Sequence, residues 1–243
     1  MLRTFIVMAL LALAAVPPSL AQDEEDAIIV TASRYRDRYE EFVVPHVAVT
    51  RRADSAAMNL TISSDTRDAP ARRSELSDAL RGLARLGNGG VSLGIVQEDG
   101  DEGQGRVRIV RFSVEAALQL LRPGARADTS QVTIVLRTPV RAEDTLESVE
   151  ARLNAFRLGA PRPGRVEYFS GDIELVLVNP PQYRAPVIAA ITADANTITR
   201  GLGAGYGVRL EGLENPIAWK RAGDLDLRLF VPYRMVVLPG GAD

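Results

Sequence analysis

The chain contains no cysteine and only one histidine, His46. Without cysteine there is no disulfide framework, and no thiol is available for lipid attachment after a signal peptide. Zinc and related transition-metal centres draw most of their ligands from cysteine and histidine, so such a centre is not expected. His46 falls on an alternating, strand-like stretch, where a structural or exposed role is expected. The sequence predicts no metal and no cofactor.

A clear excess of positive charge is missing as well. The chain has 29 lysines and arginines against 31 aspartates and glutamates, a formal net charge of −2. Nucleic-acid-binding domains usually carry a basic excess that pairs with phosphates, so no nucleic-acid partner is predicted. Nearly all the positive charge is arginine, because Lys220 is the only lysine.

Recognisable catalytic motifs are also lacking. No serine stands in a G-x-S-x-G elbow, and His46 is the only histidine that could serve as its base. The glycine-rich stretch 201–207 follows a predicted helix and lacks G-x-G-x-x-G spacing, which predicts a helix end and turn. Residues 99–103 begin like a calcium loop, but Val110 stands where the bidentate glutamate is needed. We therefore predict a protein that is not an enzyme, with a hydrolase carrying an unrecognised site as an alternative.

Long apolar runs are confined to the N-terminus. Arg3 precedes an apolar run at 5–16, and Ser19 and Ala21 place small residues at the −3 and −1 positions of a cleavage site. This pattern is typical of a secretory signal peptide, and the run is too short to span a bilayer. The sequence predicts a signal peptide at 1–21, cleavage after Ala21, a periplasmic location, and no transmembrane segment in the mature chain.

Residues 22–42 are acidic and charge-rich, and we expect a flexible N-terminal segment there. Within it, residues 28–34 resemble the TonB box near the mature N-terminus of TonB-dependent outer-membrane transporters. The chain is far too short for a transporter's plug and barrel, so only the box is shared. The resemblance implies docking to a TonB-type periplasmic domain by β-strand addition. The predicted partner-binding residues are Ile28, Ile29, Val30, Thr31 and Ala32. Alternatively, this stretch is an edge strand of the protein's own sheet or an unstructured tail.

The remaining residues, 43–239, mix two hydrophobic periods. Period-2 or β-branched patterns predict strands at 43–50, 58–64, 91–96, 107–112, 132–136, 166–169, 173–178, 206–213, 217–220 and 225–238. Helical spacing predicts three amphipathic helices, at 70–86, 142–157 and 183–201. Their buried faces are expected to include Leu76, Leu80, Leu83, Leu146, Val149, Leu153, Phe156, Val187, Ile191, Ala195, Ile198 and Leu202.

This order of elements predicts an α+β fold with mixed, mainly antiparallel sheets. Segments 166–169 and 173–178 are expected to pair as a hairpin, and 225–238 to supply a major strand. A strand–helix–hairpin unit occurs twice in the pattern, so an internal duplication is possible. Acidic residues near the second helix are expected to be solvated or to compensate its dipole: Glu143, Asp144, Glu147 and Glu150.

Three stretches together resemble the SIMPL domain family, also known as DUF541. They are 58–66 leading into the first helix, 132–136 leading into the second, and 183–208 followed by a final apolar strand. The resemblance covers about residues 45–239 and implies a periplasmic or envelope α+β protein without established catalytic residues. Some members of that family assemble into ring-like or channel-like oligomers. We therefore predict a role in protein–protein contacts or self-assembly, with a homo-oligomer as one partner arrangement. The alternative is a TonB-linked adaptor that docks through residues 28–34.

Overall fold

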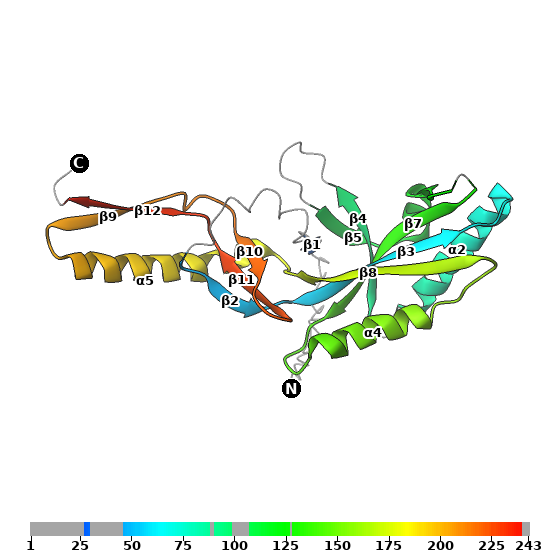
Figure 1. The fold of residues 1–243 in the computed structure, drawn as a ribbon, viewed down its shortest axis with the longest axis horizontal. Helices are drawn as coiled ribbons and strands as arrows, with labels where there is room; N and C mark the ends of the chain where they lie inside the picture. Colours follow the sequence, from blue (N-terminus) through cyan, green and yellow to red (C-terminus); the bar gives the residue numbers. More distant parts are fainter. Residues whose placement is uncertain (1–26, 30–45, 88–89, 99–106, 127, 240–243) are drawn as a thin grey trace, which may run out of the picture.

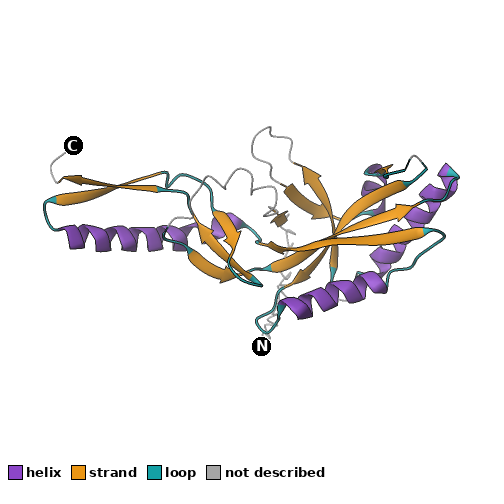
Figure 2. Cartoon of the chain, viewed as in Figure 1, coloured by secondary structure: helices purple, strands orange, loops and turns teal. Residues whose placement is uncertain are grey.

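The computed structural model describes residues 27–29, 46–87, 90–98, 107–126 and 128–239. The chain forms an elongated molecule with a large sheet at one end and a narrow projection at the other (Figure 1). Helices and antiparallel strands alternate without a parallel βαβ unit among the described pairs, so the predicted α+β class is confirmed (Figure 2). No helix in the described part of the chain is long and apolar enough to cross a bilayer.

The large sheet holds seven strands in the order β1-β5-β4-β7-β3-β8, with β6 also pairing with β7. Their bounds are β1 Ala27–Ile29, β3 Ser55–Ser64, β4 Ser92–Glu98, β5 Val107–Arg111, β6 Arg122–Pro123, β7 Ser130–Pro139 and β8 Val166–Val176. A three-stranded sheet follows in the order β10-β11-β2, with β2 Val49–Arg52, β10 Ala218–Arg221 and β11 Asp226–Phe230. The third sheet pairs β9 Tyr206–Glu211 with β12 Arg234–Pro239.

Four α-helices lie in the described residues: α2 Ala69–Leu86, α3 Val114–Gln119, α4 Leu146–Leu158 and α5 Arg184–Leu202. A 3-10 turn, η1 Pro180–Tyr183, leads into α5. The Asp68 side chain caps α2 by accepting a 2.9 Å hydrogen bond from the Ala71 N–H. Thr145 and Ser148 form a reciprocal capping box that starts α4.

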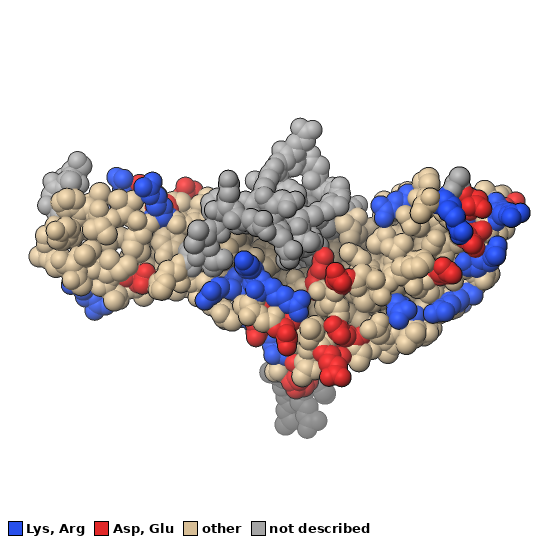
Figure 3. Space-filling model, viewed as in Figure 1, with Lys and Arg blue, Asp and Glu red and all other residues tan. Residues whose placement is uncertain are grey.

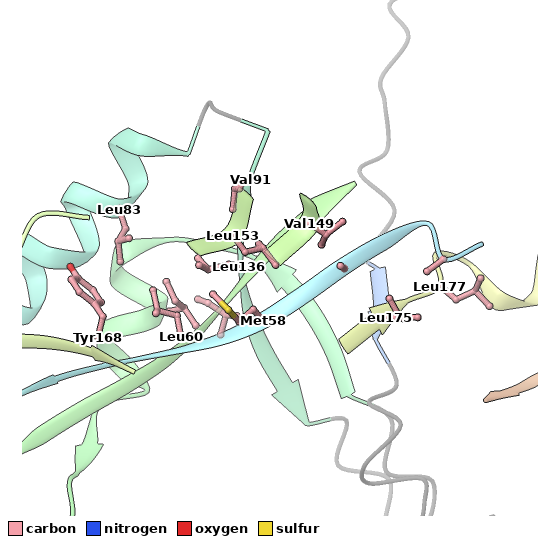
Figure 4. Close-up of a cluster of buried hydrophobic side chains, with 14 of the residues drawn as sticks. Met58, Leu60, Leu83, Val91, Leu136, Val149, Leu153, Tyr168, Leu175 and Leu177 are labelled. Atoms are coloured by element: carbon pink, nitrogen blue, oxygen red, sulfur yellow. The ribbon is translucent and has the colours of Figure 1, made fainter. Parts of the chain in front are cut away.

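The main core lies between the large sheet and its helices (Figure 4). Alternate residues of β3, such as Met58 and Leu60, face this core because side chains alternate across a strand. Leu80, Leu153 and Ile191 are fully buried, as their helical spacing predicts. The opposite face of the sheet carries a second, small buried cluster of Ala57, Ile109, Val135 and Val176.

Ala53 and Asp54 join β2 to β3 and so tie the three-stranded sheet to the large one. The Ala53 N–H donates to the Leu225 carbonyl at 2.9 Å, and the Asp54 N–H donates to the Val176 carbonyl at 3.0 Å. The Asp54 carboxylate also accepts a 2.8 Å hydrogen bond from the Val178 N–H. These backbone and side-chain bonds fix the angle at which the two sheets meet.

Several predicted boundaries are wrong. The segment 166–178 is not a hairpin, because β8 runs unbroken through Ser170–Asp172 and pairs with β3 along its length; the register shifts only between Met58 and Leu60. The segment 225–238 is split into β11 and β12, because residues 231–233 leave the strand conformation around Pro232. Strand β12 therefore joins a two-stranded sheet and is not a major sheet member.

Smaller corrections concern residues next to these elements. Strand β2 extends two residues beyond the predicted strand, through Arg51 and Arg52. Leu202, expected in the buried stripe of the third helix, is 40% exposed. Of the strand predicted at 43–50, residues 43–45 lie outside the described residues, and the prediction is wrong for 46–48, because β2 begins only at Val49.

Candidate functional site

The far end of the large sheet gathers charged side chains where β3, β7 and β8 meet. Asp65 accepts ion pairs from Arg126, at 3.2 Å, and from Arg165, at 3.3 Å. All three side chains are at least one-third exposed, so each pair contributes little to stability. Figure 3 shows blue and red side chains crowded at this end of the molecule.

Glu75 of α2 forms hydrogen bonds at the same end of the large sheet. Its carboxylate accepts hydrogen bonds from the Ser64 hydroxyl at 2.7 Å, from the Thr66 hydroxyl at 2.8 Å and from the Arg165 N–H at 3.3 Å. Burial favours the neutral acid, but these donors together outweigh it and hold the pKa of Glu75 below its usual value. Glu75 is therefore an ionised structural anchor for the turn that follows β3.

A shallow hollow of about 200 Å³ opens beside this charged cluster. It is lined by Ser63, Asp65, Ala125, Arg126, Thr129, Gln131, Arg165, Glu167 and Phe169. Asp65 is already engaged by two guanidinium groups, which leaves it a poor general base. The described residues contain no group of three or more side chains that could hold a metal ion. The hollow can accommodate a small polar group, but its residues do not assemble a nucleophile with a base.

Asp144 departs from the expected solvated role. Its side chain is 6% exposed and pairs with Arg152 of α4 at 2.5 Å. A hydrogen bond from the Arg141 N–H, aided by Arg152 and by the Ser148 hydroxyl, lowers its pKa despite the opposing effect of burial. This pair joins the loop before α4 to the helix itself. Its role is structural, and Glu143, Glu147 and Glu150 stay exposed as expected.

The predicted docking residues lie at the edge of the large sheet, as far as they are described. Ile28 and Ile29 belong to β1, which pairs antiparallel with β5 opposite Arg108 and Val107. Val30, Thr31 and Ala32 lie outside the described residues, as does the rest of segment 30–45 and the acidic loop 99–106. His46 is exposed, and the stretch 201–207 ends α5 at Gly203, whose φ of 84° suits glycine in a turn.

The opposite end of the molecule is a narrow projection, here called the arm, which consists of α5, β9 and β12 (Figure 1). In α5 only the first half is anchored, through buried Val187, Ile191 and Ala195. Beyond Ala195, none of residues 196–211 and 234–239 is buried. This part of the arm nevertheless contains many apolar side chains: Ile198, Leu202, Tyr206, Val208, Leu210, Met235, Val236, Val237 and Leu238.

The arm's surface is correspondingly poor in charge. Its helix carries three charged residues among nineteen, Arg184, Asp194 and Arg200. Its strands add Arg234 and the ion pair of Arg209 with Glu211. Figure 3 shows a largely uncharged face on the arm, in contrast to the opposite end of the molecule. Leu202, Tyr206 and Val237 are 40%, 49% and 47% exposed. Clustered exposed apolar side chains of this kind mark interaction surfaces.

Strands β8 and β12 are two of the edge strands of the described sheets, and they differ in protection. The free edge of β8 carries Glu167, Asp172 and Glu174, and the shifted register opposite it disturbs the ladder. Charged side chains and bulges of this kind oppose pairing with another strand. The β12 segment from Met235 to Leu238 has no charged residue and no register shift against β9. Its outer edge, which no described strand covers, lacks these protections.

Comparison with known proteins identifies no family for this chain. No protein-family model matches it, and no curated protein matches it. A hydrolase from Listeria innocua matches in structure with 12% identity over 82% of this chain and 98% of its own, at a TM-score of 0.15. An uncharacterized conserved protein from Listeria innocua matches with 11% identity over 83% and 98%, at a TM-score of 0.17. Similarity at this level carries no argument about function.

The sequence analysis missed the arm as a candidate surface. The available signal was the low charge of residues 185–199, where Asp194 is the only charged side chain. A helix that is apolar around most of its circumference needs cover on more than one side. The pattern alone did not show which side stays open.

Proposed function

We propose that this is an exported, non-enzymatic protein of the bacterial periplasm or envelope that acts by self-assembly through its arm. The observation that carries the proposal is the absence of any buried residue in 196–211 and 234–239, despite their apolar composition. A two-stranded sheet is marginally stable by itself in water and depends on further strands or on packing against another element. A second copy placed against the arm supplies the missing cover.

Three further observations support this proposal. The N-terminal pattern of residues 1–21 favours export. The charged groups at the sheet end are engaged with one another, which favours a structural role for them. The resemblance of about residues 45–239 to the SIMPL family implies an envelope protein that acts through contacts.

The test is the mass in solution of the protein produced from its full-length gene, measured by light scattering over a range of concentrations. We expect an oligomer that dissociates on dilution. The double variant Leu202→Glu, Tyr206→Glu places charges on the arm and should shift the protein to the monomer. The control Leu158→Glu changes a side chain that is 63% exposed at the end of α4 and should leave the mass unchanged. A wild-type protein that is monomeric at all concentrations would refute self-assembly.

A TonB-linked adaptor is the second candidate, because residues 28–34 resemble a TonB box; the pairing of β1 with β5 instead matches the edge-strand alternative. Residues 28 and 29 pair with β5, so a TonB-type domain would have to compete with β5 for the same backbone groups. Ile29→Pro removes a backbone donor and should abolish binding to a TonB C-terminal domain in calorimetry. If the wild type binds and the Ile29→Pro variant binds equally well, docking through residues 28–34 is excluded. A hydrolase remains a third possibility, for which the sheet-end hollow is the place to test.

A further inference from the structure

We infer that the assembly forms by antiparallel pairing of β12 with β12 of a second copy. The inference rests on the proposed self-assembly and specifies the interface through which it occurs. Two β9–β12 strand pairs joined in this way form one four-stranded sheet. Main-chain hydrogen bonds across the new seam satisfy the donors and acceptors that the outer edge of β12 otherwise presents to water.

The first support is the contrast between the edges of β8 and β12, two of the edge strands of the described sheets. Pairing at β8 with a second β8 would bring Glu167, Asp172 and Glu174 of both copies together, and the register shift would interrupt the ladder. Like charges opposite one another destabilise a strand pair. The four residues from Met235 to Leu238 bring no charge to a seam. Of these two edges, only that of β12 is suited to a second copy.

The second support is the symmetry of the pairing. Two antiparallel copies of one strand are related by a two-fold axis perpendicular to the sheet. Rotation about this axis leaves corresponding faces of the two copies on the same side of the joined sheet. A central residue, Val236 or Val237, then lies opposite itself across the axis. Arg234 and Pro239 stand at the two ends of the six-residue strand, where they do not meet their own copies. Pro239 lacks an N–H, and a strand end is where that loss matters least.

The third support is the cover that this arrangement provides. In the register of β9 with β12, Val208 lies opposite Val237, and Leu210 lies opposite Met235. Directly opposed residues share a face, and Leu210 packs against the main core, so this apolar face is turned toward the inside of the arm. Because the two-fold axis keeps faces together, both copies present this apolar face on the same side as both α5 helices. The seam thus merges two thin layers into one wider core.

The absence of cysteine permits a clean test by disulfide trapping. Directly opposed residues in an antiparallel ladder have Cα atoms about 4.5–5.5 Å apart, which is within the range of about 4.4–6.8 Å that a disulfide requires. The single variants Val236→Cys and Val237→Cys, oxidised with copper phenanthroline, should give a covalent dimer at whichever residue lies on the axis. The control Phe169→Cys places a thiol on β8, at a side chain that is 54% exposed, and should stay monomeric on a non-reducing gel.

A second measurement does not depend on register. Val237→Lys introduces like charges near the axis and should raise the dissociation constant at least tenfold in light scattering, whereas Phe169→Lys should leave it unchanged. Circular dichroism and the fluorescence of Trp219, the only tryptophan, check that each variant is folded. An oligomer that forms normally with Val237→Lys, and that yields no disulfide at 236 or 237, overturns the β12 seam but leaves self-assembly intact. A wild-type monomer overturns both.

Discussion

Leu153→Ala should weaken the packing of α4 against the large sheet and lower the free energy of unfolding. Leu153 is fully buried, and it is one of only two buried residues in this 13-residue helix; the other is Val149. A helix of this length is marginal by itself in water, so its stability depends on that apolar contact. Truncating a buried leucine to alanine costs about 2–5 kcal/mol through lost transfer energy and the residual cavity. Because Leu153 is one of the two fully buried anchors of the helix, we expect a loss of about 3–5 kcal/mol.

The assay is urea unfolding at one fixed protein concentration, followed by circular dichroism and by Trp219 fluorescence. Trp219 lies in β10, in the sheet next to the arm, so the two signals report different parts of the molecule. Coincident transitions would license a single free energy of unfolding. The matched control is Leu158→Ala, the same change on an exposed leucine at the end of the same helix, which should stay within about 0.5 kcal/mol of the wild type. Equal losses below 0.5 kcal/mol for both variants would show that Leu153 is not a core residue.

Two other substitutions test local interactions. Asp144→Asn removes the negative charge that pairs with Arg152 and should lower the free energy of unfolding by about 2–4 kcal/mol at neutral pH. The loss is small for a buried pair because Arg152 keeps its hydrogen bonds to the Thr138 hydroxyl and to the Pro139 carbonyl. Folding lowers the pKa of Asp144, so its carboxylate contributes fully to stability at a pH above the unfolded pKa of about 3.9. This contribution is lost as the pH falls through the lower pKa of the folded state. The difference between variant and wild type in urea titrations should therefore shrink in acid, and a difference constant down to pH 2 would contradict the ionised pair. Asp68→Ala deletes the cap of α2 and should cost about 1 kcal/mol in the same assay, with Asp68→Asn close to wild type; no difference between the two variants would show that the cap is not used.

Local chemistry explains which helices and strands could be predicted. Asp68 followed by Pro70 marks the start of α2, and the spacing of Leu76, Leu80 and Leu83 identifies the face that it buries. Alternation in residues 58–64 and 132–136 likewise identifies strands that pair in the sheet. These signals lie within one or two helical turns or a few strand residues, so no distant contact is needed to interpret them.

The errors arise where a distant partner outweighs a local signal. Ser170, Gly171 and Asp172 have the composition of a turn, yet the long β3 strand pairs on both sides of them and keeps β8 continuous through a shifted register. Pro232 has the opposite effect, because its missing N–H interrupts an apolar run that otherwise looks like one strand. Asp144 has the position of an ordinary acidic residue before a helix. In the structure Arg152, from within α4, forms an ion pair with it.

The sequence by itself determined the α+β class and the buried faces of α2, α4 and the first half of α5, because hydrophobic periods are local properties. It placed the start of α4 at 142, four residues before Leu146, and it missed the short helix α3. Only the tertiary structure decided that no residue in 196–211 or 234–239 is fully buried, and that β8 and β12 are open edges with different protection. Whether an apolar face is buried depends on which distant element reaches it. Which elements come together is set by the order of strands in the sheets and by the connection at Ala53 and Asp54. No local sequence pattern encodes either of these.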